Sequence, residues 1–241
     1  MGVERNIAQI KGRIAAAAQR AGRDPDEVTL VAVAKTFPAE AVVEAHQAGV
    51  STFGENKVQE AEPKIAAVAE ALGEGKVSWH MVGHLQRNKA KRAVRLFDCI
   101  HSVDSIRLMQ ELEKRCSALE VESGEEKRIP VLLEVNVSRE ATKYGLPADD
   151  SAQIEGIVEA IWDSPHLVLQ GLMTMAPVVA DPEEARPYFR QLRCLRDALA
   201  RRFPASDWRH LSMGMTDDFE VAVEEGATLV RIGRAIFGHR E

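Results

Sequence analysis

The segment Val28–Lys35, which reads VTLVAVAK, shows the pattern from which the fold can be predicted. Its residues are apolar on both faces of an extended chain, as is typical of a parallel strand buried between a core and an outer layer of helices. It ends in a lysine, just before the turn Thr36-Phe37-Pro38. A lysine there either extends its ammonium group to water or, with its pKa lowered by burial, forms an imine with a carbonyl compound. On this strand alone, the first role is favoured.

Seven further segments repeat the extended apolar pattern, and helical patterns stand between them. These strands are predicted at 51–56, 76–83, 97–102, 129–138, 166–175, 208–214 and 227–233. The alternation, without a linker or low-complexity tract, predicts one α/β domain over residues 1–241, folded as a (β/α)8 TIM barrel. An open doubly wound sheet would use fewer strands, and no G-x-G-x-x-G motif follows the first strand. An amphipathic helix within residues 1–22 is expected to flank the barrel.

Composition and charge narrow the class of protein. The chain has 241 residues, of which 45% are hydrophobic and 28% charged, which is typical of a globular protein. Its net charge of -6 gives no support for a nucleic acid or an anionic membrane as partner. No stretch approaches the ~20 apolar residues of a membrane span, and the charged N-terminus does not resemble a signal peptide. Three cysteines without a C-x-x-C motif indicate reduced thiols. We therefore expect a cytoplasmic protein, present as a monomer.

Polar residues and glycines gather where the predicted strands end, at the face that carries the chemistry of such barrels. Lys35 and Asn56 follow the first two strands, and Ser212, Gly214 and Gly233 close the last two. The loops after the last two strands are the usual phosphate site of this fold. Glycine there admits close approach, and a helix start offers free N–H groups. The alternative is that these glycines only make turns.

Arg231 lies within the last predicted strand. Alternation along a strand places it on the face opposite Val230 and Ile232. If those two residues meet the helices, Arg231 faces the centre of the barrel, where a charge requires a partner. That partner is either Glu134, in the middle of the strand 129–138, or an acceptor on a ligand.

Other polar patterns in the sequence give weaker evidence of a functional site. His80 and His84 have the spacing of metal ligands on a helix, but they fall in a predicted strand and the rest of a ligand set is missing. We therefore predict no metal site. The run 86–95 holds five basic residues and is interpreted as a solvated helix face; the alternative is a nucleic-acid patch, but no aromatic residues are interleaved with the basic ones. Asp104 is predicted to cap the helix that follows it.

An imine-forming lysine, a phosphate site and an inward arginine together suggest pyridoxal 5'-phosphate (PLP). The chain resembles the YggS/PROSC family of pyridoxal-phosphate homeostasis proteins over nearly its whole length. The matching stretches are VAVAKTFP, FGENKVQE, WHMVGHLQRNK, HSVDS, LLEVNVSREATKYG, GLMTM, LSMGMTDDFEVAVEEGATLVRIG and AIFG.

The resemblance implies the barrel of alanine racemase, which is that of the fold type III PLP proteins. It implies that Lys35 is the Schiff-base lysine, that Arg231 meets the pyridine nitrogen and that Asn56 lies near the ring hydroxyl. It also implies that Ser212, Gly214 and Gly233 surround the phosphate.

One position departs from the family. After the stretch RIG many relatives have Thr or Ser, whereas this chain has Arg234. Its guanidinium either donates to the phosphate in their place or points to solvent, in which case one phosphate contact is lost.

Two functions remain open at this point. The first is a carrier that holds PLP and hands it to PLP-dependent apo-enzymes without turning over a substrate. The second is a PLP-dependent amino-acid racemase, which needs a base on each face of the substrate. In alanine racemase the second base is a tyrosine of a separate domain, and we expect no such domain in this chain. This chain has two tyrosines, Tyr144 and Tyr188, and only Tyr144 is expected near the site. The carrier is therefore favoured.

Overall fold

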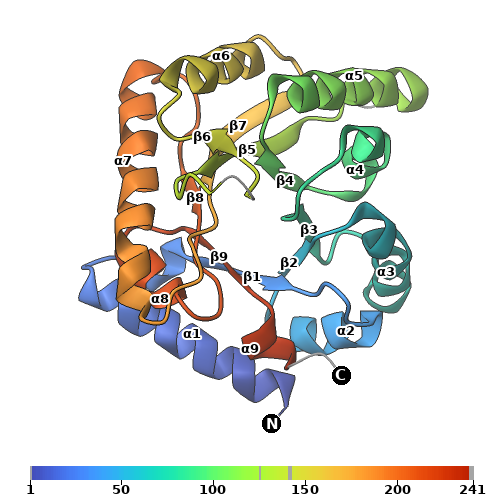
Figure 1. Cartoon of the computed structure of the whole chain (residues 1–241). Coiled ribbons are helices and arrows are strands. Elements are labelled where there is room, and N and C mark those ends of the chain that lie inside the picture. The colour runs from blue at the N-terminus through green and yellow to red at the C-terminus, as the bar shows by residue number, and fades with distance from the viewer. Residues whose placement is uncertain (1, 125, 141–142, 239–241) are drawn as a thin grey trace.

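The computed structural model describes residues 2–124, 126–140 and 143–238, and within them eight parallel strands close into a barrel (Figure 1). The barrel strands are β1 (Thr29–Val33), β2 (Thr52–Glu55), β3 (Ser78–Met81), β4 (Cys99–Val103), β5 (Ile129–Asn136), β7 (Leu167–Met173), β8 (His210–Ser212) and β9 (Leu229–Ile232). Neighbours along the chain pair with one another, β4 pairs with β5, and β1 pairs with β9 to complete the circle. The predicted barrel is thus confirmed. The short strand β6 (Leu146–Pro147) pairs with β5 and was not expected from the sequence.

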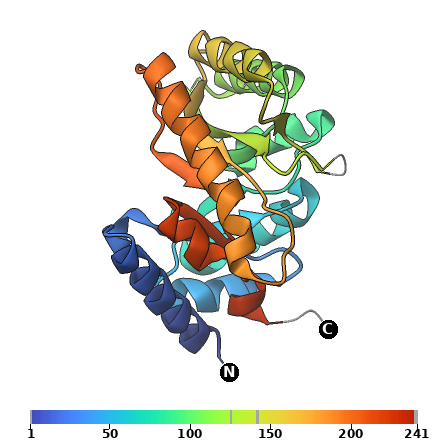
Figure 2. The same ribbon diagram turned by 60° about the vertical axis from the view of Figure 1, so that its left-hand side comes forward.

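Helices surround the barrel in the order that the sequence pattern predicts (Figures 1 and 2). They are α1 (Val3–Arg20), α2 (Ala39–Gln47), α3 (Val58–Leu72), α4 (Ala90–Leu96), α5 (Ile106–Ser123), α6 (Ser151–Trp162), α7 (Arg186–Arg202), α8 (Phe219–Glu224) and α9 (Arg234–Phe237). In the described part of the chain, 3-10 turns also lie at Pro25–Glu27, Arg87–Lys89 and Pro182–Ala185. The helix α1 packs against α2, α8 and α9. No helix in the described ranges combines the length and apolar character that a membrane crossing requires.

Strand alternation separates two apolar cores. The larger lies between the strands and the helices and includes Val230 and Ile232 of β9. The smaller contains Val31 and Val33 of β1 together with Leu229 of β9. Because successive side chains of a strand point to opposite faces, the smaller core is the interior of the barrel. Arg231 shares the face of Leu229, so the expectation that it points inward agrees with the packing of its neighbours.

The register between β7 and β8 depends on a glycine. Gly171 has φ 141°, a conformation that side chains disfavour, and it pairs with His210. A Cβ atom at this position would lie 1.9 Å from the carbonyl oxygen of His210. The two strands therefore approach one another at a distance that only glycine permits.

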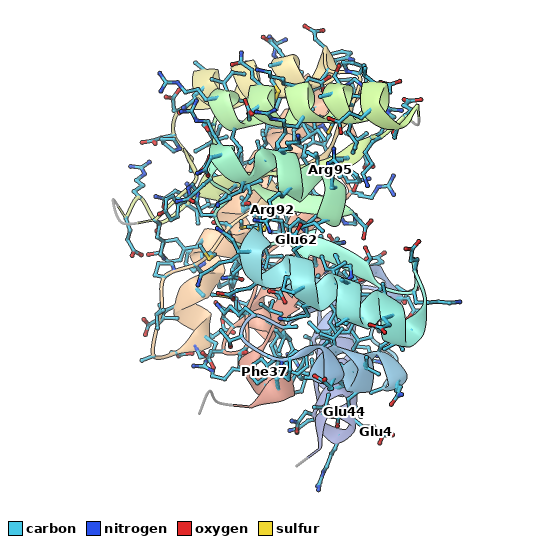
Figure 3. All side chains as sticks on the ribbon, turned by 90° about the vertical axis from the view of Figure 1, so that its right-hand side faces the viewer. Glu4, Phe37, Glu44, Glu62, Arg92 and Arg95 are labelled. Carbon is cyan, nitrogen blue, oxygen red and sulfur yellow. The ribbon has the colours of Figure 1, made fainter. Side chains whose placement is uncertain are left out.

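The basic run 86–95 forms the 3-10 turn Arg87–Lys89 and most of α4. Two of its arginines bind acidic residues of the flanking helices. Arg92 pairs with Glu62 of α3, and Arg95 pairs with Glu122 of α5. Figure 3 shows Arg92 and Glu62 facing one another across the two helices. All four side chains are about half exposed. The run thus contributes to helix packing as well as to the solvated surface.

The predicted cap of α5 is wrong by one residue. Ser105, and not Asp104, is the N-cap, and its hydroxyl accepts a hydrogen bond from the N–H of Leu108. The carboxylate of Asp104 instead accepts from Ser105 and lies 3.1 Å from Nδ1 of His84. Sequence alone does not decide between two adjacent residues that both favour this position.

Candidate functional site

Lys35 stands at the carboxyl mouth of the barrel, two residues beyond the end of β1, and is half-buried. The backbone before it is held by a buried lysine of α3, because Lys64 Nζ donates to the carbonyl of Ala34 at 2.6 Å. Lys64 also lies 2.5 Å from the carboxylate of Glu55, which ends β2 and is fully buried. Through these two contacts Lys64 holds the ends of β1 and β2 together. It thereby fixes the position of the Lys35 backbone.

Arg231 extends its guanidinium into the barrel, where the residue is only 5% exposed. Nη1 donates to Ser212 Oγ at 2.6 Å and Nη2 donates to the carbonyl of Thr174 at 2.8 Å. Among the described residues, no carboxylate forms an ion pair with it. Burial lowers the pKa of Arg231 to about 10, so the group stays charged at neutral pH. It is therefore a buried cation whose described side-chain hydrogen bonds all go to neutral groups.

Glu134, the carboxylate considered from the sequence as the partner of Arg231, lies inside the barrel and is 2% exposed. It acts on Arg231 at a distance rather than through a hydrogen bond. Burial, and then the charge of Asp104, raise the pKa of Glu134 to about 7, and the charge of Arg231 opposes this rise. Its Oε2 has no hydrogen-bond partner in the described part of the chain. The interior thus holds a carboxyl group poised to titrate near neutrality.

Two histidines continue the polar chain behind Arg231. His101 Nδ1 lies 2.9 Å from Ser212 Oγ, and His101 Nε2 lies 2.9 Å from His80 Nδ1. Burial lowers the pKa of His80 to about 4 and that of His101 well below its ordinary value. Both rings are therefore neutral at pH 7. Spacing along the sequence relates His80 only to His84. Alternation of side chains along β3 and β4 places His80 and His101 on the inner face of the barrel. Their contact can be predicted from this pattern.

The expected phosphate residues lie where the last two strands end. Ser212 is fully buried, and its hydroxyl contacts Arg231 and His101 in the interior. Gly214 has φ 90°, and a Cβ there would lie 2.6 Å from the Cβ of Ala222 in α8. A Cβ on Gly233, the N-cap of α9, would lie 2.9 Å from the carbonyl oxygen of Val33. Both glycines therefore also meet packing demands.

Arg234, the residue that departs from the family pattern, is half exposed and pairs with Asp217. This ion pair joins the start of α9 to the loop that follows β8. The side chain is thus directed along the rim of the mouth, where neither of its two predicted roles is decided.

Asn56, after β2, lines a cavity of about 400 Å³ at the same mouth. Gly83 allows this packing, because a Cβ there would lie 2.5 Å from the carbonyl oxygen of Asn56. The cavity is also bordered by His84 and Tyr144, whose rings stack 3.7 Å apart at 9°. Lys35 and Arg231 are not among its lining residues. Because cofactor chemistry depends on titratable and hydrogen-bonding groups, we place the candidate site at Lys35 and Arg231, with this cavity beside it.

A parallel eight-stranded barrel with a lysine after its first strand and an arginine inside its last places the protein in the class of PLP-binding (β/α)8 barrels of the alanine racemase type. Residues 6–241 match the family described as "Alanine racemase, N-terminal domain". The "Pyridoxal phosphate homeostasis protein" of Vibrio alginolyticus is 40% identical over 99% of this chain and 98% of its own length.

Solved structures of other proteins share this fold. The structure of PipY from Synechococcus elongatus PCC7942 with PLP bound has a TM-score of 0.79 and 34% identity, and the match covers 95% of this chain and all of that one. An alanine racemase of Clostridium difficile 630, 12% identical, shares the fold with a TM-score of 0.67 over 99% of this chain and 57% of its own. This chain belongs to the pyridoxal phosphate homeostasis proteins, within the family of the alanine racemase N-terminal domain.

Proposed function

We propose that the protein binds PLP at the carboxyl mouth of the barrel and serves to store and deliver it within the cell. The observation that carries this proposal is the buried guanidinium of Arg231, whose described partners are the neutral Ser212 and Thr174. A guanidinium has five N–H donors, and the described hydrogen bonds use only two. A pyridine nitrogen is an acceptor that suits the remainder. PipY, solved with PLP bound, supports the same ligand.

The residues present fit the cofactor. Lys35, at the end of the strand that pairs with β9, supplies an amine, and Val31 of the same strand is the register partner of Arg231. Lys35 thus lies four residues further along than the partner of Arg231, or roughly 13 Å at the rise of a strand. Two long side chains can span the ends of a small aromatic ring placed between them. When bound, PLP supplies an aldehyde, and we propose that Lys35 Nζ forms an imine with it, releasing one water.

The remaining predicted ligand residues are proposed to contact PLP from the same mouth of the barrel. Backbone N–H groups near Gly214 and Gly233 are proposed to bind the phosphate, since both glycines open turns at the mouth. Asn56 is proposed to contact the ring hydroxyl from the end of β2. Ser212 is assigned the further task of holding Arg231 in position.

We propose storage and delivery rather than racemisation, with PLP-dependent apo-enzymes as recipients. Racemisation requires a second base opposite the lysine. Tyr188 lies on the outer helix α7, and Tyr144 is 54% exposed with its ring stacked on His84. A half-exposed tyrosine in a loop suits neither a fixed position nor the exclusion of water that carbanion chemistry needs.

The test of the cofactor assignment is reduction with borohydride followed by peptide mapping. Protein loaded with PLP should absorb in the visible range and carry the reduced label on Lys35. The variant Lys35→Ala should fold and remain colourless, whereas Lys57→Ala, which removes an exposed lysine of the same mouth, should load as the unmodified chain does. Label on Lys57 or Lys143 in place of Lys35 would contradict the assignment.

The choice between carrier and racemase is tested in deuterated water. Incubation with L-alanine and other amino acids should give no deuterium incorporation at the α-carbon on the timescale of a dedicated racemase. Rapid incorporation with loss of optical purity would overturn the carrier function while leaving PLP binding intact.

A further inference from the structure

A second cluster of chemically active side chains lies inside the barrel, on β3 and β4. Each of His80, Cys99 and His101 offers a ligand atom, and these three atoms lie within 4.8 Å of one another. His80 and Cys99 are register partners on the two strands, and His101 follows Cys99 at the next position of the same face. Cys99 is 5% exposed and His101 is fully buried. We propose that these three residues form a binding site for a soft d10 metal cation, Cu⁺.

The donor set selects the kind of metal. Two imidazole nitrogens and one thiolate suit copper and zinc, whereas calcium, magnesium and manganese prefer oxygen ligands. No carboxylate belongs to the cluster in the described part of the chain. The strands that carry these residues are central and paired on both sides. The ligands therefore stand on rigid elements rather than on loops, as a preformed metal site requires.

The charge balance favours a monovalent ion. Cu⁺ bound to one thiolate and two neutral imidazoles gives a neutral complex, whereas Zn²⁺ in the same set leaves a net positive charge. An uncompensated charge in the buried interior of a barrel is costly, and here a second cation is close. Arg231 is linked to His101 through a single side chain, since both contact Ser212 Oγ. Repulsion between Arg231 and a positively charged complex would add to the cost of Zn²⁺.

The hydrogen-bonding partners of the cluster also fit. Histidine ligands of metals commonly use their second ring nitrogen in a hydrogen bond that orients the ring. His101 Nδ1 has such a partner in Ser212 Oγ at 2.9 Å, which leaves Nε2 for the metal. Nε2 lies 2.9 Å from His80 Nδ1; a cation bound to both nitrogens, at about 2.0 Å from each, would replace their mutual hydrogen bond and move the two nitrogens further apart. The ring proton between them then moves to the outer nitrogen of one ring, and the thiol proton of Cys99 leaves to solvent. One proton is thus released for each ion bound.

The test is an anaerobic titration of the full chain with Cu⁺ in the presence of the competing chelator bicinchoninate, before and after loading with PLP. One equivalent should bind, with release of one proton. X-ray absorption at the copper edge should report one sulfur and two nitrogen neighbours. Cys99→Ser and His80→Gln should each weaken binding by more than about 100-fold, because each removes a direct ligand and even the loss of a supporting group costs 10 to 100-fold.

The chain offers matched controls. Cys116 is a second buried free cysteine, on α5, and Cys194 is exposed on α7. The variants Cys116→Ser and Cys194→Ser should both bind Cu⁺ as the unmodified chain does. Circular dichroism establishes that the Cys99→Ser chain is folded, and the sulfur neighbour seen by X-ray absorption is lost only if Cys99 is the ligand. Absence of a one-equivalent site, or its loss in Cys116→Ser, would refute the proposal, and retention of Zn²⁺ but not Cu⁺ would overturn the choice of ion.

Discussion

The buried pair of Lys64 and Glu55 gives a prediction whose size can be worked from the structure. In the variant Lys64→Met, the carboxylate of Glu55, which is fully buried, loses the ammonium group that lies 2.5 Å away. Its other oxygen already has no hydrogen-bond partner in the described part of the chain. A charged carboxylate without a partner is too costly to keep in this position, so we expect Glu55 to take up a proton when the variant folds.

The cost of that proton depends on pH. Burial already raises the pKa of Glu55 above the ordinary value of 4.5, and the hydrogen bond and charge of Lys64 oppose the rise. In the variant the opposing effect is gone. Holding the group neutral at pH 7.5, three units above 4.5, costs about 4 kcal/mol at about 1.36 kcal/mol per unit. This agrees with the roughly 3–5 kcal/mol measured when buried pairs are broken elsewhere.

The sign of the pH dependence follows from linkage. The folded variant binds one proton more than its unfolded chain at pH above 4.5, so its stability falls as pH rises, by about 1.36 kcal/mol per unit. The measurement is urea unfolding of both chains between pH 5 and pH 8. The deficit of Lys64→Met should be small at pH 5 and about 4 kcal/mol at pH 7.5.

Two further variants sharpen the measurement. Lys57→Met breaks a pair of the same chemistry on the surface, where Lys57 is 67% exposed beside Glu60, and should cost less than about 1 kcal/mol at any pH. The double variant Glu55→Gln with Lys64→Met removes the titrating group and should lose the slope. A deficit for Lys64→Met that does not change with pH would refute the reasoning, because protonation of Glu55 could not then be its cause.

Three further predictions concern charge elsewhere in the molecule. If Arg231 meets the pyridine nitrogen of bound PLP as proposed, it should keep that nitrogen unprotonated, since two positive charges would otherwise lie together. Nitrogen NMR with labelled cofactor should show protonation only in Arg231→Glu, and a protonated ring in the unmodified chain contradicts this. If the guanidinium of Arg234 leaves Asp217 to bind phosphate, Arg234→Ala should weaken PLP far more than pyridoxal, and equal weakening places Arg234 elsewhere. His166 lies 2.5 Å from Glu113 and 2.6 Å from Glu120, and their hydrogen bonds raise its pKa above 6.5. The contribution of these contacts to the free energy of unfolding is therefore complete below pH 6.5 and is lost as pH rises through the folded-state pKa. Urea unfolding of His166→Gln across this pH range should lack that pH-dependent contribution.

Local periodicity was sufficient to predict the barrel and the inward direction of Arg231. Both depend on the alternation of side chains within single strands, as the placement of Val230 and Ile232 among the helices illustrates. The partners of Arg231 could not be predicted in the same way. Ser212 and Thr174 come from other strands, and their distance from the guanidinium depends on the shear of the closed barrel.

The same limit explains the rest of the site. Spacing along the sequence relates His80 to His84, four residues away, whereas its neighbour in space is His101 on the adjacent strand. Arg234 is expected either at the phosphate or in solvent, and the structure pairs it, at the start of α9, with Asp217 in the loop after β8. Each of these contacts joins segments whose proximity is set only by the complete fold. The chemical role of Lys35 remains a prediction, since it follows from its position rather than from a contact.

The pairing of β1 with β9 has a consequence for the synthesis of the protein. Val31 and Arg231 are register partners although 200 positions separate them along the chain. Contacts between such distant segments form slowly, because a long loop must close before they can contribute. During translation Arg231 leaves the ribosome 200 residues after Val31. A nascent chain therefore lacks one side of the proposed cofactor site until β9 docks, and chains released before β9 is made would have no complete site in which to retain a reactive aldehyde.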